Sequence, residues 1–424
     1  MRWMDEEVRL REPNRKQLIL QSVDYETLID AEHPARAIWR VLEGLDLSRF
    51  CAPIKARENG PGRDATDPRM LLGLWLYGLS EGVNSAREIE RLSTAHSAYR
   101  WLCGGVSVNH HLLSDFRSGH RAALDELFTQ VLGLLLDQRL ISLSRVAQDG
   151  TRVRASAGAA SFRRKARLKA CMGAARHHLE LLNAEAERDP AQGSARQRAA
   201  ELRAARDYEE RCQRAVARLA ELDAHQAAAK NHPQRKSETR ISTTDPEARV
   251  MKMADGGFRP AYNLQFATDT ESRIIVGVAA NNSGTDSQQL APMLDEIERR
   301  TGALPRQHLA DGGYMNFAAV ERAAARGVEV FVPPRANRTY HIDPLTPQPA
   351  DSAAIAAYRK RMGSAEGKRI YLERAATAET VNADLKTWRG LDRLLLRGPT
   401  KVLMLATWSA LAYNLMRSIK MGWL

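Results

Sequence analysis

The hydrophobic pattern of the chain changes near residue 143 and then follows a fixed order of strands and helices. Upstream, apolar residues recur every three or four positions; downstream, Tyr262, Leu264 and Phe266 alternate with polar residues. The pattern predicts strands at residues 143–149, 261–268, 273–280, 308–311 and 328–332. It predicts helices at residues 287–300 and 317–325, and a last helix that includes residues 371–386. This order indicates a mixed α+β or α/β fold.

The expected strand order brings two aspartates together. Three strands followed by helix, strand, helix, strand and helix is the order of the ribonuclease-H-like arrangement, in which the first and fourth strands are parallel neighbours. Asp149 ends the first predicted strand and Asp311 ends the fourth, so we expect their carboxylates to lie side by side. Gly150 and Gly312 follow them directly, and glycine permits a tight turn and close approach of a ligand.

The segment from Tyr371 to Lys386 contains neither proline nor glycine and includes a phenol, Tyr371, and two bases, Arg374 and Lys386, around the acid Glu379. On a helix, Glu379 and Lys386 lie about 20° apart, and Tyr371 lies within about 80° of them. Arg374 lies to the side, where its guanidinium could bind a phosphate through two hydrogen bonds. Alone, the segment would fit a solvated helix equally well, but the two upstream aspartates favour a functional site.

Composition favours a polyanionic partner. The chain has 63 Lys and Arg against 51 Asp and Glu, which gives a formal net charge of +12. Its longest apolar runs, residues 70–79 and 402–413, are shorter than the roughly 20 residues that span a bilayer. Residues 1–11 lack the apolar core of a signal peptide. We therefore expect a cytoplasmic protein with no membrane partner and reduced cysteines.

Residues 1–140 have a helical pattern throughout. In Asp67-Pro68 a capping side chain is followed by proline, which suits the first turn of a helix. Several short helices with polar tips can form a helix-turn-helix-like DNA reader, and we expect Arg117 to contribute to DNA binding. The alternative is an all-helical packing domain whose charges are solvated.

Residues 155–250 form an insertion of different composition between the first two strands. The insertion is rich in Ala, Arg, Glu, Leu and Gln, and Asp189-Pro190 interrupts its middle. We predict a helical hairpin or coiled coil that projects from the rest of the chain. Arg163, Arg164 and Lys165 begin its densest basic cluster, which is suited to a nucleic-acid backbone. A solvated spacer and a dimerisation element are the alternatives.

Together these motifs resemble the DDE transposases of bacterial insertion sequences, in the branch with a Tyr-Arg-Glu-Lys signature. Tyr371, Arg374, Glu379 and Lys386 match that signature, although four residues rather than three separate Arg374 from Glu379. The segments that also resemble the family are residues 98–105, 113–117, 148–153 and 310–314. The resemblance extends from about residue 30 to residue 414.

The resemblance implies two domains. A helical DNA-binding domain would occupy residues 1–140, and a ribonuclease-H-like catalytic domain would occupy residues 141–424, interrupted by the insertion. The implied partners are DNA, as transposon ends and target, and further copies of the chain in a homo-oligomer, because two ends must be brought together.

The resemblance also implies a site for two Mg²⁺ or Mn²⁺ ions. Asp149 would bridge both ions, and Asp311 and Glu379 would each complete one site. Two such ions, about 3.5 to 4 Å apart, can activate the attacking oxygen and stabilise the leaving one, and Mg²⁺ prefers oxygen ligands. Lys386 would contact a DNA phosphate, whereas Tyr371 and Arg374 would complete the catalytic set.

Two other functions remain open. One is a DNA-binding protein derived from such an element that no longer cuts, and the other is a structure-selective nuclease without strand transfer. Three further acids compete for roles in the site, and we assign Asp255 to a turn, Asp269 to the end of a strand and Asp286 to a helix cap.

Overall fold

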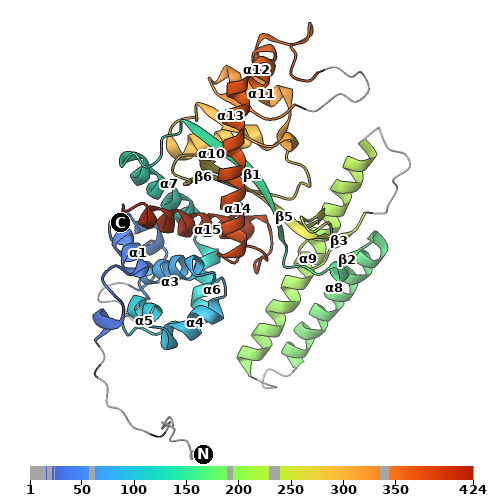
Figure 1. Ribbon diagram of the computed structural model, residues 1–424. Coiled ribbons are helices and arrows are strands. Elements are labelled where there is room, and N and C mark those ends of the chain that lie inside the picture. Colours follow the sequence, from blue (N-terminus) through green and yellow to red (C-terminus); the bar gives the residue numbers. More distant parts are fainter. Residues whose placement is uncertain are drawn as a thin grey trace, which may run out of the picture.

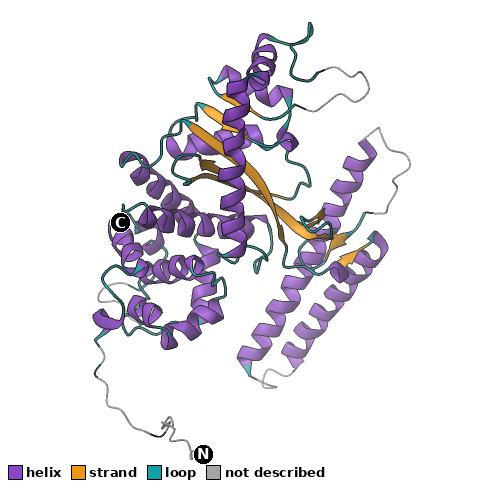
Figure 2. Ribbon diagram, in the orientation of Figure 1, coloured by secondary structure: helices purple, strands orange, loops and turns teal. Residues whose placement is uncertain are grey.

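The computed structural model describes residues 16, 22, 24–56, 63–188, 194–228, 239–334 and 343–423. Figure 1 shows N-terminal helices, a twisted sheet with helices beside it, and a two-helix hairpin that projects from the sheet. Strands occur in the sheet and at the base of the hairpin (Figure 2).

The N-terminal region is helical, as its sequence pattern predicts. Its elements are η1 (Tyr25–Leu28), α1 (Pro34–Glu43), α2 (Ser48–Cys51), α3 (Pro68–Ser80), α4 (Ala86–Ala95), α5 (Ser97–Cys103), α6 (His110–Gly119) and α7 (Arg121–Asp137). The Asp67 side chain accepts a hydrogen bond from the backbone N–H of Arg69, and Pro68 occupies the first turn of α3. Helix α3 is buried along almost its whole length, with Trp75 fully buried, so it forms the centre of this region.

The main sheet has the order β4-β5-β1-β7-β8, and β6 also pairs with β5. Its strands are β1 (Arg145–Arg154), β4 (Arg249–Lys252), β5 (Phe258–Asp269), β6 (Ile275–Asn281), β7 (Gln307–Leu309) and β8 (Glu329–Phe331). Strand β5 is antiparallel to β1, β4 and β6. Strand β7 is parallel to β1 and β8, so the expected parallel pairing of the first and fourth predicted strands is present.

Strand β1 is longer than the sequence pattern predicts. It continues to Arg154 rather than ending at Asp149, because the long strand β5 pairs with it as far as Arg154. Asp149 therefore lies within β1. The pattern also fails to predict β4, an edge strand of four residues.

Helices cover both faces of the sheet. They are α10 (Leu290–Thr301), α11 (Phe317–Ala325), α12 (Ala353–Gly363), α13 (Ala365–Arg374), α14 (Thr380–Thr387) and α15 (Pro399–Lys420). Successive side chains of a strand point to opposite faces. Gln148 donates a hydrogen bond to the carbonyl of Gln289, just before α10, whereas Asp149 accepts one from Asn382 on α14. Helices α10 and α14 thus approach opposite faces of β1.

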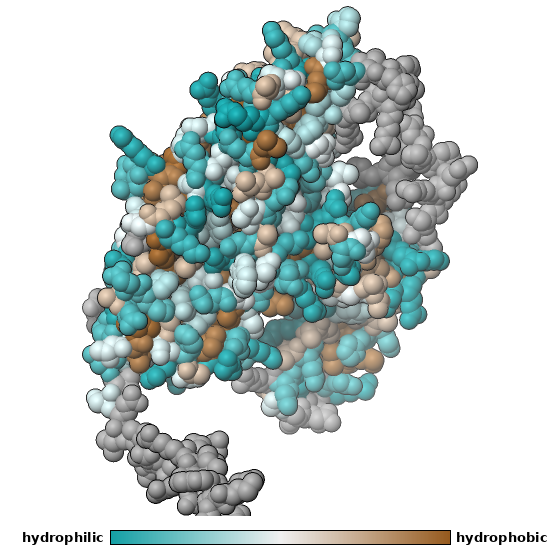
Figure 3. Space-filling model, viewed as in Figure 1, coloured by the Kyte–Doolittle hydropathy of each residue, from teal (hydrophilic) through white to brown (hydrophobic). Residues whose placement is uncertain are grey.

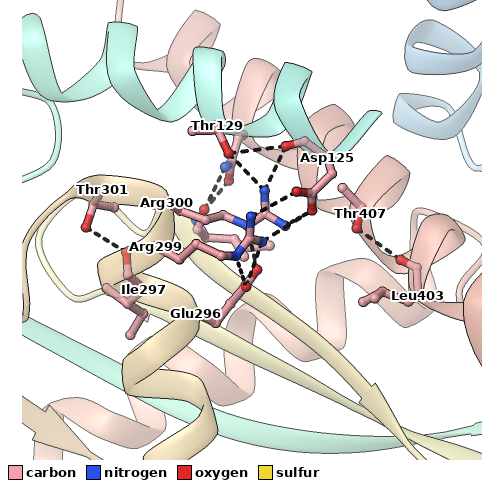
Figure 4. Close-up of polar contacts among 11 residues, drawn as sticks. Asp125, Thr129, Glu296, Ile297, Arg299, Arg300, Thr301, Leu403 and Thr407 are labelled. Carbon is pink, nitrogen blue, oxygen red and sulfur yellow. Dashed lines mark hydrogen bonds and ion pairs between the residues drawn. The ribbon is translucent and has the colours of Figure 1, made fainter. Parts of the chain in front are cut away.

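Helices α7, α10 and α15 join the N-terminal region to the sheet (Figure 4). The side chain of Arg300 on α10 is only 3% exposed and forms ion pairs with Glu296 and with Asp125 on α7. Its guanidinium also lies 4.7 Å from the ring centroid of Phe128. One hydrophobic core continues from the N-terminal helices through α15 into the sheet. The two regions therefore pack as one structure.

The insertion forms a helical hairpin. Helices α8 (Lys165–Arg188) and α9 (Ala195–Ala228) pack against each other, and a short ladder of β2 (Phe162–Arg163) with β3 (Ile241–Ser242) closes their base. Leu168, Leu219 and Ile241 are buried in a small core near that base. Farther along, Arg176 of α8 forms an ion pair with Glu209 of α9 at 3.1 Å. A charged pair thus occupies a hairpin contact where an apolar residue would be usual.

The face of the molecule shown in Figure 3 is largely hydrophilic, and hydrophobic side chains are scattered among hydrophilic ones on it. Within the described part of the chain, no helix combines the length and the apolar character that crossing a lipid bilayer would require.

Candidate active site

The parallel pairing of β1 with β7 places Asp149 near Asp311. Ala147 is paired with Leu309, so the same register continued by two residues places Asp149 opposite Asp311. Asp311 begins the 3₁₀ turn η3 (Gly312–Tyr314) and accepts a hydrogen bond from the N–H of Gly313 at 2.7 Å. Both aspartates are partly exposed. The sequence-based expectation that these two carboxylates are neighbours agrees with this register.

The charge environment of Asp149 supports the same arrangement. Burial raises the pKa of Asp149 to about 6; the positive charge of Arg374 opposes this rise, and the negative charge of Asp311 adds to it. Asn382 and the N–H of Gly150 donate hydrogen bonds to the carboxylate, at 3.0 and 2.9 Å, and also oppose the rise. Asp149 is thus a half-buried acid that lies close to a second acid.

A π-helical turn brings Arg374 to Glu379. The turn η4 (Ala375–Glu379) lies between α13 and α14, and a π-helix bonds residues five apart instead of four. Arg374 and Glu379 are five apart, and the Nη2 atom of Arg374 donates to Oε1 of Glu379 at 2.6 Å. The additional residue between these two signature positions is therefore accommodated inside the helix, and the pair stays together.

Arg374 links Glu379 to the aspartates. Its side chain is 13% exposed, whereas that of Glu379 is 57% exposed. Burial lowers the pKa of Arg374, but the charges of Tyr371, Asp149 and Glu379 outweigh this effect and raise it overall. The guanidinium therefore balances negative charge from both sides of the site.

Lys386 and Tyr371 border the same site. Burial lowers the pKa of Lys386, and the negative charges of Asp149 and Asp392 oppose this effect. Burial raises the pKa of Tyr371, and the guanidinium carbon of Arg374 lies 5.9 Å from its ring centroid. All four residues of the Tyr-Arg-Glu-Lys pattern thus lie on the helical segment that covers Asp149.

Asn382 is a site residue that the sequence reasoning did not assign a role. It is 7% exposed, and its side-chain amide donates to Asp149 at 3.0 Å. Its position gives a signal in the sequence, because it follows Glu379 by three residues and precedes Lys386 by four, which is helical spacing.

Asp286 lies on the other face of β1 and does not cap a helix. Helix α10 starts at Leu290 with Gln289 as its N-cap. The Asp286 carboxylate instead accepts hydrogen bonds from the side chains of Asn263 and Gln265, at 2.6 and 2.7 Å. A side chain at Gly150 would clash with these groups, since a Cβ atom there would lie 2.8 Å from Oδ1 of Asp286.

The other two rival acids have the structural roles that the sequence suggests. Asp255 accepts a hydrogen bond from the N–H of Gly257 in a turn and pairs with Arg259. Asp269 is fully buried at the end of β5, where it accepts hydrogen bonds from Ser272 and from the N–H of Leu143. Neither acid faces the candidate site through any of these contacts.

The two aspartates fit a divalent metal ion better than the complete set of three acids does. Asp149 and Asp311 provide the oxygen donors that Mg²⁺ and Mn²⁺ prefer, and a bound cation would relieve their repulsion. Glu379, however, is paired with Arg374. Within the described residues, no group of three or more His, Cys, Asp or Glu side chains is arranged to hold a metal ion. Glu379 would have to leave Arg374 to join the aspartates.

The structure separates the predicted DNA-binding residues into two groups. Arg163 lies in β2, and Arg164 and Lys165 follow it as exposed residues at the base of the hairpin. Arg117 is instead 4% exposed; it donates to the carbonyl of Asn84 at 2.6 Å, and its guanidinium stacks over Trp75 at 4.3 Å. Arg117 is therefore a core residue and does not lie on a DNA-binding face.

Comparisons with known protein families match two parts of the chain. Residues 23–119 match a family described as a transposase domain, and residues 221–415 match the family described as the transposase DDE domain. The second match includes Asp311, Glu379 and Lys386 and begins after Asp149. No curated protein and no solved structure matched the chain. The two family matches support a transposase family of the DDE type for this chain.

Proposed function

We propose that the protein is the DNA transposase of an insertion sequence, which binds terminal inverted repeats and catalyses metal-dependent strand cleavage and strand transfer. The observation that carries this proposal is the common register of Asp149 and Asp311 beneath the helical segment of Arg374 and Glu379. The two transposase-family matches support it.

The sheet supports a ribonuclease-H-like catalytic domain. Strands β6, β5 and β1 are antiparallel neighbours, and β1, β7 and β8 continue as parallel neighbours. This is the order that the sequence pattern predicts for such a domain. The fold indicates where a site can form, but the chemistry is argued from the side chains.

In the proposed mechanism, Asp149, Asp311 and Glu379 would hold two divalent cations, Mg²⁺ or Mn²⁺. Such ions, when bound, activate the attacking oxygen and stabilise the leaving one. Lys386 contacts a phosphate near the bond that is cut, and Arg374 changes partner from Glu379 to DNA. Water is the nucleophile for cleavage at the element's end, and the freed 3′-hydroxyl then attacks the target in the same site.

A joining assay tests this proposal. The full-length protein is incubated with Mg²⁺ and labelled DNA ends taken from inverted repeats that flank the coding region. Joined products support a transposase, cleavage without joining supports a structure-selective nuclease, and binding without cleavage supports an inactive DNA-binding protein. Bringing two ends together also requires an oligomer, which the size of the protein–DNA complex would show.

Substitution of the acids tests the site. Asp149→Asn, Asp311→Asn and Glu379→Gln should each abolish cleavage, because each removes a proposed metal ligand, while DNA binding remains. Asp255→Asn is the matched control, since Asp255 pairs with Arg259 in an exposed turn. If any of the three variants cleaves DNA at the full rate, the residue substituted in that variant is not part of the catalytic site.

A further inference from the structure

A basic pocket lies where β1 reaches the base of the helical hairpin. Its volume is about 460 Å³, and four arginines line it together with one aromatic residue: Arg154, Arg259, Arg393, Arg397 and Phe258. Among the described residues that line the pocket, none is acidic. None of these five residues belongs to the candidate active site described above.

Segments distant in the sequence are bonded together to form this pocket. Leu394 donates to the carbonyl of Arg154 at 2.8 Å, and Arg393 forms a parallel bridge with Arg154. The Nε atom of Arg397 donates to the carbonyl of Ser156 at 3.2 Å. The segment after α14 is therefore fixed against the end of β1, which holds the arginines of both in one place.

The positive charge of the pocket is mostly unbalanced. Arg259 forms an ion pair with Asp255 at 2.6 Å, and the more distant charge of Arg154 also contributes to lowering the pKa of Asp255. Arg154, Arg393 and Arg397 are exposed, and they form no ion pair with any acid in the described part of the chain. Three guanidinium groups thus remain available for an anionic ligand, and guanidinium geometry suits phosphate.

Phe258 adds an apolar surface beside these charges. It is the first residue of β5 and is 70% exposed. An exposed aromatic ring next to arginines is the combination that binds single-stranded nucleic acid, because a base stacks on the ring while the cations contact phosphates. A small anion would leave the ring without such a partner.

The pocket lies at the far end of the strand that carries Asp149. Arg154 follows Asp149 by five residues on β1, which corresponds to about 17 Å along a strand. Because this spacing is odd, the two side chains leave β1 on opposite faces, so the pocket extends around the end of the strand from the side of the active site. Figure 1 shows β1 and β5 running from the sheet to the base of the hairpin.

We propose that this pocket binds one DNA strand, about 17 Å along β1 from the candidate active site. Arg154, Arg393 and Arg397 contact phosphates, and Phe258 stacks on an unpaired base. The inference rests on the proposed function in taking DNA as the substrate, and it assigns a path to one strand between the active site and the hairpin.

Binding of a fluorescent single-stranded oligonucleotide, measured against salt concentration without divalent ions, tests this inference independently of cleavage. Arg393→Gln combined with Arg397→Gln should weaken binding at least tenfold and reduce the salt slope by about 1.4, or 0.7 for each lost phosphate contact. The matched control is Arg322→Gln with Lys360→Gln, two exposed cations on α11 and α12, which should leave the slope unchanged.

Phe258→Ala separates stacking from charge. It should weaken binding about tenfold and leave the salt slope unchanged, because no phosphate contact is lost. If the two double variants bind the oligonucleotide with the same affinity and salt slope, the pocket assignment is wrong while the proposed function stands. The same conclusion follows if Phe258→Ala binds as tightly as the unmodified protein. If the unmodified protein does not bind the single-stranded oligonucleotide, the inference fails, and the joining assay decides the proposed function separately.

Discussion

At the scale of single residues, Asn382 holds the carboxylate of Asp149 from the helix side. The hydrogen bond favours the charged form of Asp149, which is the form that binds a metal ion. We predict that Asn382→Ala lowers the cleavage rate by about 10- to 100-fold, the usual effect of removing a partner of a metal ligand.

Thr380→Ala is the control for this prediction. Thr380 lies on the same helix, but its hydroxyl donates only to the carbonyl of Ala376. Its substitution should change the cleavage rate by less than about twofold. A folded Asn382→Ala protein with an unchanged rate would show that Asn382 does not assist Asp149.

His308 makes the stability of the fold depend on pH. Burial lowers the pKa of His308 to about 4, below its ordinary value of 6.5, so the ring is neutral in the folded protein. Between these values the unfolded chain binds the proton and the folded chain does not, so stability falls as pH falls from 6.5 towards 4. From pH 7.5 to 5 this amounts to about 2 kcal/mol.

Denaturant unfolding of the protein and of His308→Gln at both pH values checks this number. Glutamine can still donate to Gln148, which His308 contacts at 2.9 Å, but it does not titrate. Between pH 7.5 and pH 5, the unmodified protein should lose about 2 kcal/mol more unfolding free energy than His308→Gln does. Equal losses would show that His308 is not the group responsible.

The prediction that Asp149 and Asp311 are neighbours agrees with the register of β1 and β7, although Asp149 lies within β1 and not at its end. Arg117 is misassigned because a basic residue at the end of a short polar helix looks exposed, whereas Trp75 and Asn84 in fact cover it. Such a contact depends on how distant helices pack, which local patterns do not report.

At the scale of elements, the π-helical turn sets the position of Arg374. We predict that deletion of Ala375 is tolerated, because Arg374 and Glu379 would then be four residues apart, which are neighbours on an α-helix. Insertion of one alanine after Ala375 should instead rotate Arg374 by about 100° and abolish cleavage.

Cleavage and thermal unfolding of both variants check this prediction. The insertion protein should remain folded yet inactive, while the deletion protein should retain both properties. Loss of activity in a deletion protein that remains folded would show that the π-turn itself, and not only the Arg374–Glu379 pair, is required.

The elements themselves are largely predictable from the sequence. The capping pattern at Asp67 and the range of α11 match the structure. The π-turn does not follow from local pattern, since no proline or glycine marks it and it depends on how Arg374 and Thr377 dock on the sheet. The extension of β1 to Arg154 similarly depends on its partner strand.

At the scale of the whole molecule, two adjacent arginines join the N-terminal region to the sheet. Arg299 and Arg300 both pair with Asp125 and Glu296, but their side chains are 48% and 3% exposed (Figure 4). We predict that Arg300→Met costs about 2 to 3 kcal/mol of unfolding free energy, because the buried guanidinium of Arg300 also donates to the carbonyl of Asp125 and to the hydroxyl of Thr129. Arg299→Met should cost less than about 1 kcal/mol.

Denaturant unfolding compares the two variants directly. Each arginine pairs with the same two acids. A difference in unfolding free energy between the two variants therefore reports the burial of the guanidinium and not the number of ion pairs. Equal costs would show that the junction is stabilised by packing of α15 and not by the buried arginine.

The overall order of strands follows from the sequence, but the state of the site does not. The sequence predicts three acids at one edge, and the structure brings two of them together while Arg374 holds the third. This difference arises because Arg374 and Glu379 satisfy each other's charge within one helical segment.

Anomalous diffraction from a complex of the protein, Mn²⁺ and cleaved element-end DNA would locate the proposed metal ions directly. We expect two peaks about 3.5 to 4 Å apart beside Asp149, Asp311 and Glu379, with Glu379 released from Arg374. Absence of any peak beside Asp149, with Glu379 still paired to Arg374, would contradict this expectation.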